Sequence, residues 1–287
     1  MEKIGFIGMG RIGLPICRHL IESGASVIGY RRSSLAEFEA LGGIPAKSPA
    51  DVGAQTDIVF SCLPSVEALD EVIRGHSGLL ASARPGQIVV ELGSHPLSAK
   101  QRYVDILGEK GAHFLDGEVS GTPGMVAARK AYIYIAGDQA AANRAEPAVG
   151  RFADLYMYLG GFGGATKVKL VNNLLVALNI AGAAQAMALG LKLGIEPDKL
   201  VEAVAKGSGG STQFATRAPW MAERKFLPQQ GSIHGLLFYL EAVRQAAAEA
   251  GLATGFIDSL TATYRQAAPV VGDRDVAALI DHFDPKP

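Results

Sequence analysis

Apolar positions follow two different patterns along the chain. Up to about residue 160, short apolar runs with the length of a β-strand alternate with stretches whose apolar residues recur at helical spacing. From the glycine-rich segment 160–164 onward, they recur at helical spacing only. Alternating strands and helices are typical of an α/β domain with a parallel sheet. The pattern therefore predicts an α/β domain over residues 1–162, followed by an all-helical domain over residues 163–287.

The apolar runs also place the individual elements. In the first domain we expect strands at 3–7, 26–30, 57–63, 87–92, 113–116, 132–136 and 155–158. We expect one helix that begins at residue 12, a second that follows the second strand and ends at about residue 41, and two more at 97–109 and 140–152. In the second we expect helices at 165–192, 197–205, 213–224, 231–250 and 253–268. The first of these would be roughly 40 Å long. Because Asn172, Asn179 and Gln185 interrupt its apolar surface, we expect a core helix rather than a membrane span.

The first predicted strand runs directly into a glycine-rich turn. The turn consists of Gly8, Met9, Gly10, Arg11, Ile12 and Gly13, and a helical pattern follows it. A strand, G-x-G-x-x-G and a helix in this order form the fingerprint of dinucleotide binding. Gly8 permits the tight turn, Gly10 lets a pyrophosphate approach the backbone, and Gly13 lets the helix pack on the strand. We therefore predict a Rossmann-type first domain, the alternative being an ordinary glycine-rich turn.

The end of the second strand indicates which dinucleotide is bound. In an NAD site, an acidic residue at this place binds the 2′-hydroxyl of the ribose. Here Arg31, Arg32 and Ser33 follow the strand instead. Guanidinium groups bind phosphate through charge-assisted and bidentate hydrogen bonds. We therefore predict NADP, bound as NADPH, with a solvated basic loop as the alternative.

Composition excludes several other classes of protein. The formal net charge of −1 gives no general basic field for nucleic acid and no polybasic membrane anchor. The only two cysteines, Cys17 and Cys62, lie in apolar patterns, which argues against a disulfide framework and a cysteine-ligated metal site. The chain enters a strand at once, without the pattern of a signal peptide. We therefore expect a cytoplasmic protein without a metal, a nucleic-acid partner or a membrane partner.

Two segments at strand ends are candidates for binding chemistry. In the segment 116–124, backbone N–H groups and the hydroxyls of Ser120 and Thr122 could hold a carboxylate, unless the segment is a plain turn. Ser94 and His95 follow another strand. His95 is more readily explained as a hydrogen-bonded loop histidine than as a catalyst.

A third candidate lies in the long helix. Lys169 and Asn173 are four residues apart and therefore share one helix face. A lysine and an amide on an otherwise apolar helix are costly to bury without partners, which favours a pair that faces a cleft. The alternative is that Lys169 is solvated, as expected for Lys167 nearby.

Three ordered motifs resemble those of the β-hydroxyacid dehydrogenase family, which includes 3-hydroxyisobutyrate dehydrogenases, tartronate semialdehyde reductases and glyoxylate/succinic semialdehyde reductases. Residues 5–15 resemble its opening signature, and residues 114–121 are similar to its substrate motif, usually D-A-P-V-S-G-G. Residues 163–173 resemble its catalytic motif, G-x-x-x-K-x-x-N-N. The resemblance covers nearly the whole chain.

The resemblance implies a role for each candidate residue. Lys169 would be the general acid when a carbonyl is reduced, and Asn173 would orient the lysine or bind the substrate oxygen. Further residues would hold the substrate carboxylate (Ser120, Gly121, Thr122) or line the nicotinamide (Leu63, Pro64, Ser94). The implied activity is NADPH-dependent interconversion of a small aldehyde or keto acid and its hydroxy acid, in a homodimer or homotetramer.

The sequence also departs from the family pattern. Phe238-Tyr239-Leu240 stands where the family usually carries K-D-L, and His234 nearby is a candidate for replacing the lost polarity. Glu118 brings an acidic group into the substrate motif, next to a site expected to bind an anion. Two other functions therefore stay open, an imine reductase-like NADPH enzyme and a non-catalytic NADPH-binding protein. The retained Lys169 favours the dehydrogenase.

Overall fold

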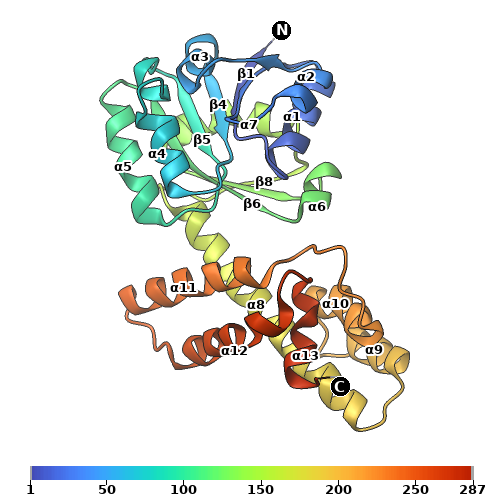
Figure 1. Cartoon of the computed structure of the whole chain (residues 1–287). Helices are drawn as coiled ribbons and strands as arrows, with labels where there is room; N and C mark the ends of the chain where they lie inside the picture. Colours follow the sequence, from blue (N-terminus) through green and yellow to red (C-terminus); the bar gives the residue numbers. More distant parts are fainter. Residues whose placement is uncertain (1, 286–287) are drawn as a thin grey trace. The chain divides into compact units, whose positions relative to one another are not determined.

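The computed structural model describes residues 2–285. The chain divides into two compact units, Met1–Lys169 and Leu170–Pro287, and Figure 1 shows the sheet of the first unit and the helices of the second. The division falls within helix α8 (Gly164–Lys192). The domain boundary expected after residue 162 stays a prediction.

The first unit contains an eight-stranded sheet with the order β3-β2-β1-β4-β5-β6-β7-β8. Neighbouring strands are parallel except for β6 and β7, which are antiparallel. The strands are β1 (Lys3–Ile7), β2 (Ser26–Tyr30), β3 (Ile44–Pro45), β4 (Ile58–Ser61), β5 (Ile88–Glu91), β6 (His113–Ser120), β7 (Tyr132–Ala136) and β8 (Leu155–Tyr158). The order from β3 to β6 is that of the doubly wound dinucleotide-binding fold, which confirms the predicted Rossmann-type domain.

Helices connect the strands of this sheet. They are α1 (Gly13–Glu22), α2 (Ala36–Ala40), α3 (Pro49–Gln55), α4 (Val66–Arg74), η1 (Leu79–Ala81), α5 (Leu97–Gly108), α6 (Pro123–Ala127) and α7 (Gln139–Val149). The apolar pattern did not place β3, α3 or α4. Each of these is short, and the helices α3 and α4 begin at serine caps, since Ser48 and Ser65 accept hydrogen bonds from the backbone N–H groups of Asp51 and Ala68.

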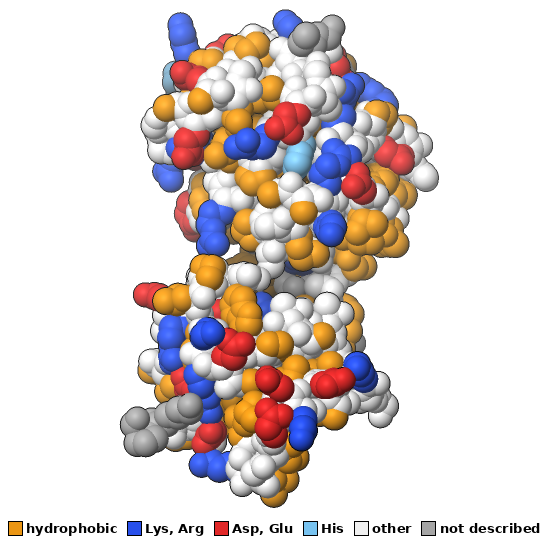
Figure 2. All heavy atoms as spheres, turned by 90° about the vertical axis from the view of Figure 1, so that its right-hand side faces the viewer, with side chains coloured by type: hydrophobic (Ala, Val, Ile, Leu, Met, Phe, Trp, Pro, Cys, Tyr) orange, Lys and Arg blue, Asp and Glu red, His pale blue; other side chains and the backbone are white. Residues whose placement is uncertain are grey.

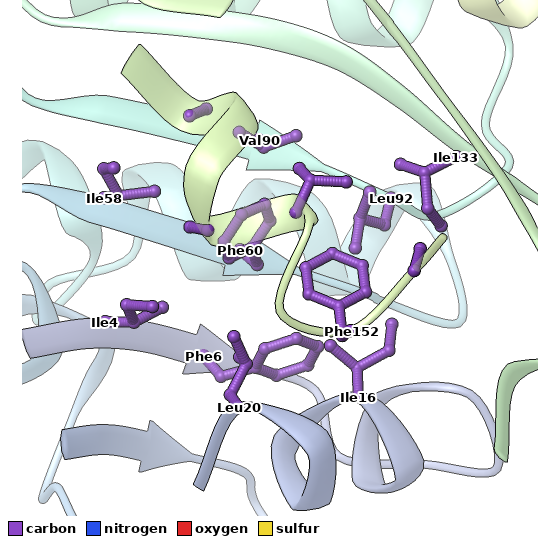
Figure 3. Close-up of a cluster of buried hydrophobic side chains, with 14 of the residues drawn as sticks. Ile4, Phe6, Ile16, Leu20, Ile58, Phe60, Val90, Leu92, Ile133 and Phe152 are labelled. Carbon is purple, nitrogen blue, oxygen red and sulfur yellow. The ribbon is translucent and has the colours of Figure 1, made fainter. Parts of the chain in front are cut away.

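The continuous apolar runs arise because the strands are buried on both faces. Along β4, Ile58 and Phe60 belong to the cluster on one face, while Val59 belongs to the cluster on the other. Figure 3 shows the first cluster, where Phe60 and Phe152 meet edge to face at 5.4 Å between ring centroids. Buried strands of this kind lose the polar alternation of a half-exposed sheet.

Strand β6 is longer than its predicted extent of 113–116. It continues to Ser120 because β7 pairs with it in antiparallel register, with Glu118 opposite Tyr134 and Ser120 opposite Tyr132. Glu118 and Ser120 therefore lie on a strand, and the loop begins only after Ser120.

The second unit is helical, as predicted. Besides most of α8, it contains α9 (Pro197–Lys206), α10 (Thr212–Glu223), α11 (Ile233–Glu249), α12 (Gly255–Val271), η2 (Val276–Leu279) and α13 (Ile280–Phe283). Ala177, Ile180 and Met187 of α8 lie in its core. Among the described residues, α8 is the one helix long and apolar enough to span a membrane, a criterion that core helices also meet. On the face shown in Figure 2, Lys and Arg side chains are interspersed with Asp and Glu side chains on both units.

Candidate active site

The glycine-rich turn between β1 and α1 has the geometry that a dinucleotide site requires. Gly8 has a positive φ of 92°, and a Cβ there would collide with the carbonyl oxygen of Cys62. A Cβ on Gly13 would collide with the carbonyl oxygen of Gly8. Gly10 has open space on its side-chain face. The fold therefore requires Gly8 and Gly13, whereas Gly10 leaves a space that fits an approaching pyrophosphate.

The other residues of the turn take different places. The side chain of Met9 is buried, Ile12 packs against the core, and Arg11 is exposed. The N–H group of Leu14 donates to the carbonyl oxygen of Gly10 at 3.0 Å, which begins the helix. The turn thus opens at the N-terminus of a ten-residue helix, where free N–H groups and the helix dipole favour a phosphate.

The two arginines after β2 are in different environments. Arg31 donates to the carbonyl oxygens of Met9 (2.8 Å) and Ser34 (2.5 Å), so that it ties this loop to the glycine-rich turn. Arg32 and Ser33 are exposed. In the described part of the chain, Arg32 has neither a hydrogen bond nor an ion pair, so its guanidinium group is available to a ligand.

The remaining candidates follow adjacent strands of the sheet. Leu63 and Pro64 follow β4, Ser94 follows β5, and Ser120 ends β6. Because β4, β5 and β6 are parallel neighbours, their carboxyl ends share one edge of the sheet. Ligands bind at this edge in open α/β sheets.

A buried polar network lies beside this edge. Lys100 of α5 donates to Asp116 (2.9 Å), to Glu118 (3.3 Å) and to the carbonyl oxygen of Gly117 (3.1 Å). Asp116 also accepts from the backbone N–H (2.9 Å) and the hydroxyl (2.7 Å) of Thr166. The network therefore joins α5 and the start of α8 to β6.

Glu118 connects this network to the predicted catalytic residues. The hydroxyl of Ser94 donates to Glu118 at 2.5 Å. Burial raises the pKa of the Glu118 carboxyl, while Lys100, the Ser94 hydroxyl and Lys169 act in the opposite direction. Both carboxylate oxygens accept hydrogen bonds, the arrangement expected for the ionised form.

Lys169 is buried, with 7% of the residue exposed. Its Nζ donates to the carbonyl oxygen of Val119 at 2.7 Å, so that the ammonium lies at the end of strand β6, one residue before Ser120. Burial lowers the pKa of Lys169, and the charge of Glu118 opposes this shift. The solvated alternative for this lysine is therefore wrong, while Lys167 is exposed as expected.

A third buried carboxylate, that of Glu91, lies at the end of β5. Glu91 accepts hydrogen bonds from the hydroxyl of Ser61 and, at 2.6 Å, from the backbone N–H of Gly93. Nε2 of His95 lies 3.4 Å from Glu91, within ion-pair distance but without hydrogen-bond geometry. His95 is 5% exposed, so we assign it to the support of this loop.

The loop after β6 carries the predicted carboxylate cradle. Gly121 is exposed, and Thr122 caps the short helix α6 by accepting from the N–H of Met125 at 3.3 Å. Ser120 is half-buried. The binding of a carboxylate by these three residues stays a prediction.

The remaining predicted residues belong to the second unit. Asn173 is 7% exposed and accepts from the side chain of Asn172 at 3.2 Å. His234 is exposed. The rings of Phe238 and Tyr239 meet edge to face at 5.6 Å. The role of Asn173 beside Lys169 stays a prediction.

Sequence reasoning did not find Lys100 or Thr166. A signal for Lys100 was present, because it falls on the same buried helix face as Tyr103 and Leu107. A lysine on an apolar helix face indicates a buried counter-charge. Thr166 gave no such signal, since a threonine near a helix start is compatible with many environments.

Comparison with known proteins matches both parts of the chain. Residues 3–160 match the NAD binding domain of 6-phosphogluconate dehydrogenase, and residues 163–283 match the NAD-binding domain of NADP-dependent 3-hydroxyisobutyrate dehydrogenase. The chain belongs to the β-hydroxyacid dehydrogenase family. It is therefore an NAD(P)-dependent oxidoreductase of the class that acts on CH–OH groups.

Individual members of the β-hydroxyacid dehydrogenase family are similar to this chain over most of their length. The L-threonate dehydrogenase of Cupriavidus necator is 32% identical over 79% of this chain and 77% of its own. The solved 3-hydroxyisobutyrate dehydrogenase of Mycobacterium tuberculosis has a TM-score of 0.88 at 23% identity, covering 99% of both chains. An imine reductase from Myxococcus stipitatus also shares the fold, with a TM-score of 0.68 at 18% identity and 99% coverage of both chains.

Proposed function

We propose that this chain is an NADPH-dependent reductase that interconverts a small aldehyde or keto acid and its hydroxy acid. The observation that carries the proposal is the place of Lys169. Its buried ammonium lies against the carbonyl oxygen of Val119, one residue before Ser120 at the ligand-binding edge of a dinucleotide-binding sheet. A proton donor is thereby combined with candidates for holding the substrate.

Lys169 acts as the general acid in the reducing direction. The bound nicotinamide supplies the hydride. As negative charge develops on the carbonyl oxygen, Lys169 donates a proton to it. Burial lowers the pKa of Lys169, which makes its proton easier to release. In the oxidising direction, the neutral amine takes the proton from the hydroxyl group.

The substrate carboxylate binds at the loop after β6. The hydroxyls of Ser120 and Thr122 can donate to carboxylate oxygens, and the exposed backbone of Gly121 leaves room for close approach. Thr122 already accepts from Met125, and its hydroxyl proton is still free to donate. Binding here would direct the substrate carbonyl toward the neighbouring Lys169 and Ser94.

The proposed cofactor is NADPH rather than NADH. No acidic residue stands directly at the end of β2, and Arg32 is exposed there without an internal partner among the described residues. The match of the second part of the chain to an NADP-dependent family supports the same choice. Fluorescence titration of the protein with NADPH and with NADH measures both affinities. Tighter binding of NADH would contradict the proposed role of the arginine.

A carbonyl panel and one pair of variants test the reaction itself. We expect NADPH oxidation with at least one of glyoxylate, small semialdehydes and short keto acids. Lys169→Ala should reduce turnover by about 10²–10⁴-fold and leave NADPH affinity unchanged, since general acids contribute by this factor. Lys167→Ala is the matched control, because Lys167 is exposed on the same helix. Full turnover by Lys169→Ala would show that Lys169 is not the proton donor.

The panel also separates the alternative functions. Imine reductases share the fold, so cyclic imines belong in the same panel. Turnover of imines without turnover of carbonyls would identify an imine reductase. NADPH binding without any turnover would favour a non-catalytic binding protein. The replacement of the family's K-D-L by Phe238-Tyr239-Leu240 is the observation that supports this alternative. We also propose a homodimer or homotetramer, which light scattering during size-exclusion chromatography measures.

A further inference from the structure

The proposed reaction leaves the role of one buried acid unexplained. Glu118 is 1% exposed and stands where the family's substrate motif usually carries a proline. Its neighbours Lys100 and Asp116 are fully buried and form a pair with each other at 2.9 Å. The charges of Lys100 and Asp116 cancel, so Glu118 adds a further negative charge beside this pair.

A count of the buried charges shows what Glu118 balances. Two buried cations, Lys100 and Lys169, lie near three buried anions, Glu91, Asp116 and Glu118, and each of the five residues is at most 7% exposed. All three anions act on Lys100, and the charge of Glu118 acts on Lys169 as well. An uncompensated buried ammonium loses its proton more readily, because burial disfavours the charged form. Glu118 therefore adds a counter-charge that favours the protonated form of Lys169, while Lys100 keeps Asp116 as a second partner.

The fold fixes Glu118 in this position. One oxygen accepts from Lys100 at 3.3 Å and the other from Ser94 at 2.5 Å. Lys169 donates to the carbonyl oxygen of Val119, the residue that follows Glu118. Glu118 thus belongs to the strand segment that holds the Lys169 ammonium, and it contacts Ser94, which follows β5.

We propose that Glu118 is a positioning residue that keeps Lys169 in its protonated, proton-donating form. The proposal rests on the role given to Lys169 in the proposed function. The charged and titratable groups near Glu118 are Lys100 of α5, Asp116 of β6, Lys169 of α8 and the thiol of Cys62 after β4, and Tyr134 of β7 is its cross-strand neighbour. Glu118 pairs with Lys100 at 3.3 Å, and its charge also acts on Lys169.

The direction of the effect follows from the charges. Burial lowers the pKa of Lys169 and Glu118 raises it, so removal of the Glu118 charge lowers it further. A nearby opposite charge typically shifts a pKa by about 1–3 units, and we expect a shift at the lower end of that range, about 1 unit, in Glu118→Gln. Lys169 should therefore lose its proton about 1 pH unit lower in Glu118→Gln than in the parent protein.

The first readout does not need a substrate. Only a neutral amine reacts in reductive methylation, so the pH midpoint of Lys169 labelling, read by peptide mass spectrometry, reports its protonation. The exposed Lys167 serves as the internal reference. We expect the midpoint for Lys169 to fall by about 1 unit in Glu118→Gln, while that of Lys167 stays constant. Glu109→Gln, which removes an exposed carboxylate at the end of α5, should shift neither midpoint.

The second readout is the pH profile of turnover. In Glu118→Gln, the alkaline limb of reduction and the acid limb of oxidation should both move to lower pH, because both report Lys169. A merely structural role would lower the rates and leave both limbs in place. That result, or an unchanged labelling midpoint, overturns the proposal.

A further variant covers the case in which Glu118→Gln does not fold. Glu118→Asp keeps the negative charge, but its shorter side chain places the carboxylate farther from Lys169. It should therefore shift the labelling midpoint of Lys169 in the same direction by a smaller amount. An unshifted midpoint in a folded Glu118→Asp protein would then overturn the proposal. If the parent protein reduces no carbonyl, the proposed function fails, while the labelling midpoint still decides the role of Glu118.

Discussion

Replacement of Lys100 should destabilise the first unit more than replacement of its partner Asp116. In Lys100→Met, a side chain of similar length removes the buried charge. Asp116 and Glu118, at most 1% exposed, then lose their shared cation. In Asp116→Asn, Lys100 still contacts Glu118 at 3.3 Å and the carbonyl oxygen of Gly117 at 3.1 Å. Removing Lys100 therefore leaves two carboxylates without their cation, whereas removing the charge of Asp116 leaves Lys100 with other partners.

The expected magnitudes follow from these contacts. Removing one partner of a buried pair costs about 3–5 kcal/mol when a charge is left uncompensated. We expect this range for Lys100→Met. In Asp116→Asn the amide oxygen can still accept from Thr166, and we expect about 1–2 kcal/mol, the cost of a weakened hydrogen bond in a buried site.

Urea unfolding with two probes measures the difference. Circular dichroism follows both units, and fluorescence of Trp220, the single tryptophan, follows the second. Two probes are needed because a chain of two units need not unfold in one step. The substitutions should shift the transition of the first unit.

The pH dependence of the loss provides a separate check. Burial already raises the pKa of Glu118 and Lys100 opposes this shift, so in Lys100→Met the pKa of Glu118 lies further above its unfolded value and the folded state binds more protons. Stability then falls as pH rises, and the loss is relieved as pH falls through this raised pKa. We expect a smaller loss at pH 5 than at pH 7. An equal loss in the two variants, or a loss that grows toward pH 5, would refute the reasoning.

Two further predictions concern the cofactor site. Gly10→Ala should fold normally but lower NADPH affinity by about tenfold or more, because its methyl group occupies the space left for the pyrophosphate. Gly8→Ala should instead lower the melting temperature, since the φ of Gly8 is 92° and the added methyl group collides with the carbonyl oxygen of Cys62. Equal stability of these two variants would contradict the assignment. Arg32→Ala should weaken NADPH binding about tenfold and leave NADH binding unchanged in fluorescence titrations, because it removes a charge-assisted contact to the 2′-phosphate. Arg31→Ala should weaken both cofactors, since Arg31 holds the glycine-rich turn through Met9, and equal losses of both cofactors in Arg32→Ala would argue against NADP selectivity.

The fold could be predicted because its signals are local. Each main strand of the sheet is a continuous apolar run, and the dinucleotide fingerprint needs only adjacent residues. The extension of β6 to Ser120 depends on a distant strand, since β7 supplies its hydrogen bonds. The residues Asp116–Ser120 show no apolar run of their own, so the pattern indicated a loop there.

The candidate site could be predicted only in part, because its residues are joined across large sequence separations. Lys169 and Ser120 stand in recognisable motifs. The contacts of Asp116 with Lys100 and Thr166, by contrast, span 16 and 50 residues. Nothing near Thr166 in the sequence indicates that its backbone N–H and hydroxyl both bind one carboxylate.

Glu118 shows most clearly why the sequence alone was insufficient. Considered with the expected substrate carboxylate, it is a like charge in an anion site and weakens the case for a hydroxyacid. In the folded chain its oxygens face Lys100 and Ser94, and its charge acts on Lys169. The residue expected to oppose substrate binding thus lies among buried cations, and under the proposed mechanism its charge helps Lys169 to keep the proton that it donates. The nearest cations decide whether a buried acid repels a bound anion or supports a proton donor. For Glu118 these cations are Lys100 of α5 and Lys169 of α8, which lie far from it in the sequence.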